Sequence, residues 1–201
     1  MGIEDAKNGK LLYHLTKLSN MESIVSKGLL PRRYLINTCT KFSDIADEEI
    51  IHKRKSKELD KYVPFHFHPY SSFDVAVKNK YSNEEFVYIC IKRDLAIYGH
   101  FKILINHPLS KDGFTLYDYD EGIEKIDWDA MKPGKSDSYS RNVKMSECIT
   151  DKGIPATLFQ CVYVSNSESK KIVEDIFAKN GITEQPPFVN IQKIWFERMI
   201  V

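Results

Sequence analysis

One carboxylate is the first candidate for chemistry in this chain. Glu147 lies between Met145 and the strand-forming pair Cys148 and Ile149, and a turn at Gly153 leads into a second β-prone run. A carboxylate among apolar neighbours is costly to bury unpaired. Glu147 is therefore either an exposed residue of an edge strand, or a charge that meets a cation or hydrogen-bond donor in a cleft.

A histidine and a threonine near the N-terminus form a second candidate site. The apolar run 11–15 predicts a strand that carries His14 and Thr16 at its end. Side chains two residues apart on a strand point to the same side of the sheet, so one ligand could contact both. The alternative is that His14 is a hydrogen-bonded core histidine and Thr16 a turn residue.

An arginine offers a partner for a buried anion. The segment 43–59 predicts a helix that begins at Ser43 or Asp44, with acidic residues in its first turn and basic residues in its last. On a helical wheel Arg54 falls on the apolar side of this helix, and Lys57 is a weaker candidate on the same side. Because an inward arginine needs an anion, we expect Arg54 to face a negative charge.

The sequence gives little support for a metal site or for disulfides. His66 and His68 in the run HFH would point to one face of a strand, as two metal ligands do, but no third ligand is evident. The four cysteines form no CxxC pair and lie far apart, at Cys39, Cys90, Cys148 and Cys161. With no apolar signal segment and no run long enough to span a bilayer, we expect a reduced, cytoplasmic protein without a metal.

A mixture of strands and helices must position these candidates. Besides the strand at 11–15, apolar and β-branched runs predict strands at 62–67, 84–94, 101–106, 158–164 and 188–191. Helices are predicted over 20–28, 43–59, 71–77 and 167–179. In the first helix Asn20 is the expected N-cap and Gly28 the left-handed C-cap. Residues 31–43 should form a loop, and 108–145 a long loop with one or two short helices, a length that usually carries function.

Composition sets wider bounds. The 201 residues fit one domain, with 42% hydrophobic and 28% charged side chains as in an ordinary globular protein. The net charge of +1 provides no global field for nucleic acid or membrane, although 53–57 is locally basic. The aromatic run 62–67 suits either a stacking surface or core packing. The absence of a glycine-rich phosphate loop and of a GxSxG elbow gives no support to kinase, Rossmann or α/β-hydrolase folds.

Several short motifs in a fixed order resemble the DarT family of DNA ADP-ribosyltransferase toxins. They span residues 12–164 and are LYHLT, EIIHKR, YVPFHFHP, GFTLYD, IDWDAM and MSECIT followed by IPATLFQCVYV. The resemblance implies an α+β ADP-ribosyltransferase fold, a split, twisted sheet around an NAD cleft, in a single domain over 1–201. It also implies transfer of ADP-ribose from NAD to a base in single-stranded DNA, with a macrodomain antitoxin as partner and no metal.

The resemblance also implies roles for individual residues. The HxT run would bind the nicotinamide end of NAD through His14, Leu15 and Thr16, and Gly28 would shape the adjacent turn. The segment from about 33 to 54 would bind NAD, and 118–146 would form the substrate-facing loop. The catalytic pair would be Arg54, which also binds NAD, and Glu147.

The chemistry of these residues agrees with that assignment. Cleavage of the bond between nicotinamide and ribose passes through an oxocarbenium-like state, and a carboxylate beside the sugar stabilises the developing positive charge. Arg54 could bind the NAD pyrophosphate or help to remove a proton from the acceptor base. The first role is easier to defend, because an arginine seldom loses its proton.

Two departures from the family pattern concern the acceptor. Family members that act on thymine commonly have a methionine where this chain has Phe73, and often a histidine where it has Asp118. Both positions are candidates for contacts with DNA, so the target base is open between thymine and guanine. RNA or protein as acceptor, and a catalytically inactive nucleic-acid-binding relative, are the competing hypotheses.

Overall fold

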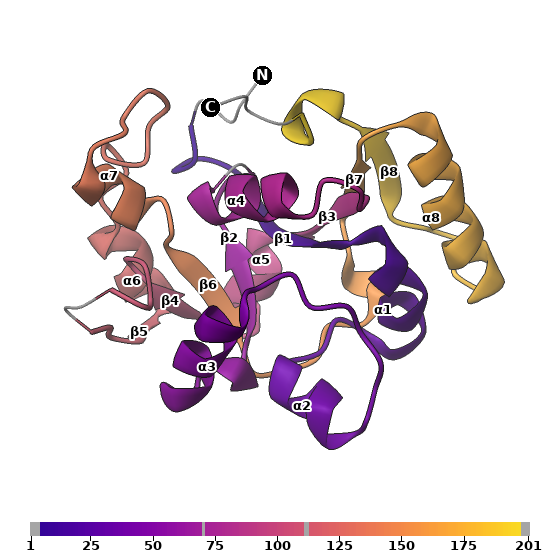
Figure 1. Cartoon of the computed structure of the whole chain (residues 1–201), viewed down its shortest axis with the longest axis horizontal. Coiled ribbons are helices and arrows are strands. Elements are labelled where there is room, and N and C mark those ends of the chain that lie inside the picture. The colour runs from indigo at the N-terminus through magenta and orange to yellow at the C-terminus, as the bar shows by residue number, and fades with distance from the viewer. Residues whose placement is uncertain (1–4, 70, 111–112, 198–201) are drawn as a thin grey trace.

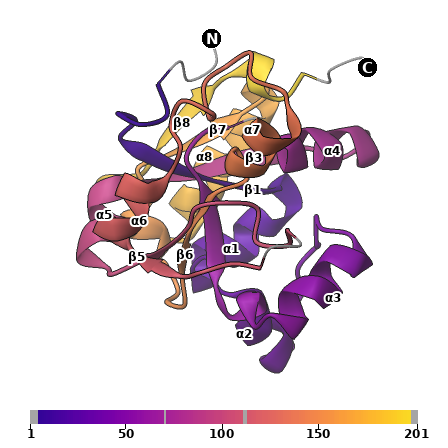
Figure 2. The same ribbon diagram turned by 90° about the vertical axis from the view of Figure 1, so that its left-hand side faces the viewer.

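A computed structural model describes residues 5–69, 71–110 and 113–197. One twisted sheet of eight strands runs through the molecule in the order β5-β4-β6-β2-β1-β3-β7-β8, and helices pack around it (Figures 1 and 2). Neighbouring strands are antiparallel except for the parallel pair β7 and β8. This architecture confirms the α+β prediction.

The strands follow the apolar runs of the sequence. They are β1 (Leu11–Lys17), β2 (Val63–His66), β3 (Phe86–Lys92), β4 (Lys102–Leu104), β5 (Tyr117–Asp118), β6 (Glu147–Thr150), β7 (Cys161–Val164) and β8 (Phe188–Ile191). The α-helices are α1 (Met21–Lys27), α2 (Arg32–Asn37), α3 (Glu48–Ser56), α4 (Ser72–Lys80), α5 (Arg93–Tyr98), α6 (Tyr119–Lys125), α7 (Ser138–Val143) and α8 (Ser167–Lys179).

The sheet is split between its two central strands. β1 pairs with β3 along its whole length, from Leu11 to Lys17. Across the split, β1 and β2 share a single registered pair, Tyr13 opposite His66. Because the two halves diverge beyond that pair, they leave room between them for a pocket. This geometry confirms the split, twisted sheet expected from the sequence.

The core packs against both faces of the sheet. β3 is buried from Phe86 to Ile91, as its unbroken apolar run predicts. On one face α1 and α8 pack apolar side chains against the sheet, including Val25 and Phe177. Such burial contributes roughly 1.5–3 kcal/mol for each large apolar side chain.

The first helix lies between the predicted cap residues Asn20 and Gly28, but the geometry at both caps differs from the prediction. Asn20 makes no capping hydrogen bond, because its side chain is bonded instead to Thr16 and Ser43. Gly28 does end the helix with a positive φ of 92°, but its ψ of 164° is not left-handed helical. A Cβ at this position would lie 3.1 Å from the Ile154 carbonyl oxygen, so the nearby backbone of Ile154 also favours glycine.

The segment between the first two predicted helices also differs. The expected loop 31–43 contains α2, and the helix expected from Ser43 or Asp44 begins only at Glu48. The reason is local, because the Asp44 carboxylate accepts hydrogen bonds from the backbone N–H groups of Ile45 and Ala46 and holds a turn there. Residues 108–145 contain the two short helices α6 and α7, as predicted, and also the short strand β5, which was not predicted.

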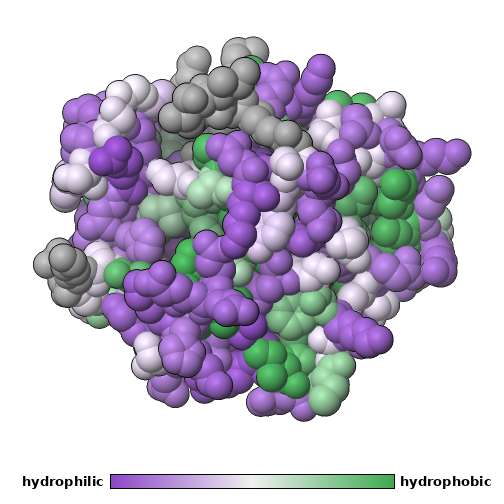
Figure 3. Space-filling model, in the orientation of Figure 1, coloured by the Kyte–Doolittle hydropathy of each residue, from purple (hydrophilic) through white to green (hydrophobic). Residues whose placement is uncertain are grey.

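The surface seen from the front is mostly hydrophilic, with small apolar patches, one of them over α2 (Figure 3). That helix exposes Tyr34 and Ile36. Within the described ranges, no helix combines the length and the apolar character needed to cross a membrane.

Candidate active site

Most of the residues singled out by sequence border one pocket at the split of the sheet. β1 contributes three of them, the turn after α1 one, α3 one, α4 one and β6 one, and these are His14, Leu15, Thr16, Gly28, Arg54, Phe73 and Glu147. They come from positions far apart in the sequence, and the fold brings them together.

Glu147 lies at the start of the interior strand β6 and borders the inner end of this pocket. Its register places it between His66 of β2 and Leu104 of β4, and only 3% of its surface is exposed. Arg54 donates two hydrogen bonds to it, Nη1 to Oε1 at 2.8 Å and Nη2 to Oε2 at 3.1 Å. The sequence-based expectation that Arg54 points inward toward an anion is therefore confirmed, and Glu147 is not an exposed edge residue.

The ion pair determines the charge of Glu147. Burial alone would raise the pKa of this carboxyl group, but the positive charge and the hydrogen bonds of Arg54 outweigh burial and lower the pKa below its ordinary value. Glu147 is therefore ionised at neutral pH. A fixed, ionised carboxylate in a pocket can stabilise positive charge that develops on a bound ligand.

Two histidines on neighbouring strands face the same pocket. His14 hydrogen-bonds through Nδ1 to the Pro64 carbonyl oxygen at 2.8 Å, which bridges the split of the sheet. His66 hydrogen-bonds through Nδ1 to the Ser146 carbonyl oxygen at 3.1 Å. Burial lowers the pKa of His14 below its ordinary value, so His14 is neutral at neutral pH. His14 is both a hydrogen-bonded histidine and a pocket residue.

The HFH run does not assemble a metal site in the described part of the chain. His66 borders the pocket, whereas His68 is directed elsewhere and hydrogen-bonds to the Pro69 carbonyl oxygen at 2.9 Å. No group of three or more His, Cys, Asp or Glu side chains suited to a metal ion occurs within residues 5–69, 71–110 and 113–197.

His107 is a pocket residue that the sequence analysis missed. The Leu109 backbone N–H donates to His107 Nδ1 at 2.9 Å, so the ring proton lies on Nε2. The backbone of His107 is fixed by Asn142, whose side-chain oxygen accepts from its N–H at 2.8 Å. Burial lowers the pKa of His107, which favours the neutral ring. The sequence did offer one signal for His107: it is a polar residue that follows the strand β4 closely, just as Thr16 lies near the end of β1.

A short loop closes another side of the pocket, and sequence reasoning missed what holds it. The Asn20 side chain donates to the Ser43 carbonyl oxygen at 2.9 Å and to Thr16 Oγ1 at 3.0 Å. Its own oxygen accepts from the Ser43 N–H at 2.8 Å. Arg32 Nε donates to Asp44 at 2.6 Å. Residues 43–46, which border the pocket, are thus tied to both β1 and α2.

The two candidate DNA contacts differ in position. Phe73 lies in the first turn of α4, is half-buried and borders the pocket. Asp118 lies on the edge strand β5, is exposed and forms an ion pair with Lys102, outside the pocket. The fold therefore groups Phe73, but not Asp118, with Glu147.

Comparison with known protein families gives a match. The family model described as "ssDNA thymidine ADP-ribosyltransferase, DarT" matches residues 13–196. Comparison with curated protein sequences gave no match.

Solved structures share the fold at low sequence identity. Thermus sp. 2.9 DarT in complex with ADP-ribosylated ssDNA has a TM-score of 0.79 and 20% identity, covering 94% of this chain and 96% of that one. Thermus sp. 2.9 DarT in complex with NAD⁺ has a TM-score of 0.76 and 19% identity, covering 94% and 98%. Thermosipho africanus DarTG in complex with ADP-ribose has a TM-score of 0.68 and 17% identity, covering 94% and 51%. Together with the family match over nearly the whole chain, they confirm the resemblance: the chain belongs to the DarT family of single-stranded-DNA thymidine ADP-ribosyltransferases.

Proposed function

We propose that this protein transfers ADP-ribose from NAD onto a thymine base of single-stranded DNA and releases nicotinamide. The observation that carries the proposal is the buried, ionised Glu147, held by two hydrogen bonds from Arg54 in the pocket of a chain of this family. We further propose that residues 1–201 form one ADP-ribosyltransferase domain. Because NAD and DNA occur together in the cytoplasm, we place the reaction there.

In the proposed reaction, the bond between the anomeric carbon of the ribose and the nicotinamide nitrogen breaks first. Its electron pair leaves with nicotinamide, and positive charge develops on the sugar. Glu147 stabilises that charge, because its carboxylate is fixed and largely shielded from water. A ring nitrogen of the acceptor base then bonds to the same carbon and gives up its proton to solvent water.

Other pocket residues have proposed roles in binding. The HxT residues of β1, with Gly28 beside them, hold the nicotinamide end of NAD, as the resemblance implies. Arg54 orients Glu147 and keeps it ionised. His107 borders the pocket with its ring proton on Nε2, and we propose that Nε2–H donates to a carbonyl oxygen of the acceptor base. Phe73 is proposed to stack on DNA, and Asp118 remains a candidate contact at the edge of the sheet.

Two structural relatives suggest the partners. One is in complex with ADP-ribosylated single-stranded DNA, and another is a DarTG protein in complex with ADP-ribose. We propose that this chain acts on single-stranded DNA as a toxin, and that a macrodomain antitoxin removes the modification.

The test is incubation of the protein with NAD labelled in its adenine moiety, together with single-stranded DNA, RNA or a protein extract in separate reactions. Label should enter single-stranded DNA alone. Digestion of the DNA to nucleosides and mass spectrometry should then place the added mass on thymidine. Labelled RNA or protein, or labelled guanosine, would replace the proposal with the corresponding alternative.

A further inference from the structure

We propose that Arg32 binds the diphosphate of NAD, and that Asp44 occupies its guanidinium in the ligand-free protein. This inference rests on the proposed use of NAD and assigns a residue to one part of it. A dinucleotide carries two negative charges on its diphosphate, and a cation with free N–H groups binds such phosphates strongly. Among the described residues that border the pocket, the two permanently charged cations are Arg32 and Arg54.

Arg54 is poorly placed to bind a diphosphate. Both of its terminal nitrogens donate to Glu147, one to each carboxylate oxygen. The exposed fraction of the Glu147 side chain is 5%, and that of Arg54 is 17%. Moving Arg54 onto a phosphate would leave the Glu147 charge buried without its partner, which is strongly unfavourable. The pair at the inner end of the pocket is therefore expected to persist when NAD binds.

Arg32 is less tightly engaged than Arg54. It donates to Asp44 through Nε alone, and its two terminal nitrogens make no hydrogen bond to any residue in the described ranges. Its side chain is 29% exposed and borders the pocket, with the guanidinium carbon 5.7 Å from the centre of the Phe42 ring. The free N–H groups on the two terminal nitrogens form an edge that matches the geometry of two phosphate oxygens.

Asp44 can release Arg32 without loss of the loop. Its Oδ1 accepts from the backbone N–H groups of Ile45 at 3.0 Å and Ala46 at 3.3 Å, whereas Oδ2 accepts from Arg32. The preceding residue, Ser43, is held independently through both its N–H and its carbonyl oxygen by Asn20. The turn therefore keeps its shape when a phosphate shares or replaces the carboxylate on Arg32.

The first arm of the test measures equilibrium binding of NAD, ADP and adenosine without DNA. Arg32→Gln should lower the affinity for NAD and for ADP by about tenfold or more, because charge-assisted contacts to phosphate are lost. The affinity for adenosine, which has no phosphate, should not change. Lys55→Gln removes the same charge from an exposed position on α3 and should leave all three affinities unchanged. Equal binding of NAD by wild type and Arg32→Gln would overturn the proposal.

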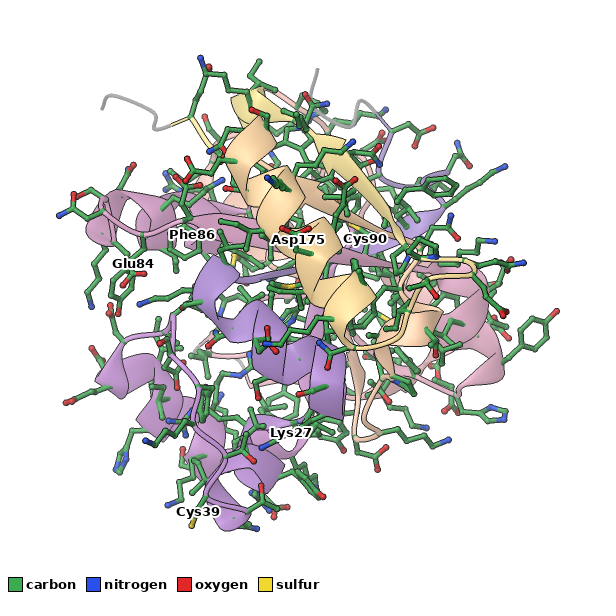
Figure 4. The ribbon with its side chains drawn as sticks, turned by 90° about the vertical axis from the view of Figure 1, so that its right-hand side faces the viewer. Lys27, Cys39, Glu84, Phe86, Cys90 and Asp175 are labelled. Atoms are coloured by element: carbon green, nitrogen blue, oxygen red, sulfur yellow. The ribbon has the colours of Figure 1, made fainter. Side chains whose placement is uncertain are left out.

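The second arm separates a ligand-binding arginine from a structural salt bridge. Asp44→Asn keeps an oxygen for the Ile45 and Ala46 N–H groups and removes the charge that competes with phosphate. It should therefore bind NAD at least as tightly as wild type, and Asp175→Asn on the exposed face of α8 is the matched control (Figure 4). If the ion pair of Arg32 and Asp44 only stabilises the loop, Asp44→Asn and Arg32→Gln will lower the affinity for NAD by similar factors. That result would contradict the proposal.

The two arms also distinguish this inference from the proposed function. NAD binding with the stated pattern but without transfer to DNA would reject the proposed function and leave the diphosphate site intact. If the wild type transfers ADP-ribose to DNA but Arg32→Gln binds NAD with unchanged affinity, the diphosphate site is rejected and the proposed function is kept. Thermal unfolding of each variant shows whether a loss of affinity reflects a loss of fold.

Discussion

Glu147 and Arg54 act as one unit at the scale of single residues. The carboxylate is buried on a central strand, where an unpaired charge would be unfavourable, and the arginine supplies two N–H donors to its two oxygens. Each partner makes burial of the other possible. Removal of either residue therefore affects folding as well as chemistry, and experiments on the pair need both measurements.

The first prediction concerns Arg54. Arg54→Ala leaves the Glu147 charge buried and unpaired, so the free energy of unfolding should fall by about 3 kcal/mol and transfer should be abolished. Lys55→Ala, one residue further on the exposed side of α3, should change both by little. Urea unfolding and a transfer assay on the two variants check this. If Lys55→Ala lost transfer and Arg54→Ala retained it, the assignment of Arg54 to the inward side of α3 and of Lys55 to its exposed side would be contradicted.

The second prediction uses the lowered pKa of Glu147. The ordinary value is 4.5, and the folded protein holds the pKa below it. The unfolded chain therefore takes up this proton at a higher pH than the folded protein does. The stabilisation is fully present above about pH 4.5 and is lost as pH falls through the lowered folded pKa. Urea unfolding between pH 7 and 3 should show this loss, and the Glu147→Gln protein should show a shallower slope over that window.

At the scale of elements, the split between β1 and β2 makes the pocket, and α4 lies at its rim. α4 begins with a capping box formed by Ser71 and Asp74, which fixes the first turn and with it Phe73. A half-buried aromatic residue at that place can pack against the protein and still offer part of its ring to a base.

The third prediction follows from this position. Phe73→Ala should weaken transfer to DNA about tenfold, because the stacking of one base is worth roughly 1–3 kcal/mol. Hydrolysis of NAD in the absence of DNA should change much less. Rates of nicotinamide release with and without an oligonucleotide give both quantities. An equal loss of the two rates would assign Phe73 to packing alone.

Sequence predicts best the elements that a regular pattern of apolar residues specifies, and it predicts poorly the side chains whose partners are distant in the sequence. An unbroken apolar run predicts the buried strand β3, and the 3.6-residue period of α3 predicts that Arg54 points inward; a single sequence displays both patterns. Asn20 occupies the predicted N-cap position, but a single sequence does not show that its side chain bonds to Ser43, 23 residues away, in place of the helix. His107 was missed for a related reason, since its place in the pocket depends on β4 pairing with β6.

At the scale of the whole molecule, the net charge of +1 bears on the nucleic acid that it binds. A nearly neutral protein lacks the field that holds duplex DNA nonspecifically, so affinity must come from stacking and from a few phosphate contacts. In addition, the reactive edge of a paired base is already hydrogen-bonded inside the stack, and exposing it costs a few kcal/mol.

The fourth prediction is a preference for single strands with a moderate salt dependence. A duplex of the same sequence should be modified at least about tenfold more slowly than the single strand. The slope of log affinity against log salt should lie between about −1 and −3, as for a few phosphate contacts. Fluorescence titrations at several salt concentrations and parallel transfer assays check both. Efficient modification of a fully paired duplex would contradict the proposed acceptor.

The central claim is that Glu147 stabilises the transition state of ADP-ribose transfer. The most direct measurement is the rate of ADP-ribose transfer from saturating NAD to single-stranded DNA by wild type and Glu147→Gln, with NAD affinity measured on the same preparations. We expect the variant to be slower by about 10² to 10³-fold, the effect of removing one group that stabilises transition-state charge, and to bind NAD within a few-fold of wild type. A folded Glu147→Gln protein with wild-type turnover would contradict the claim.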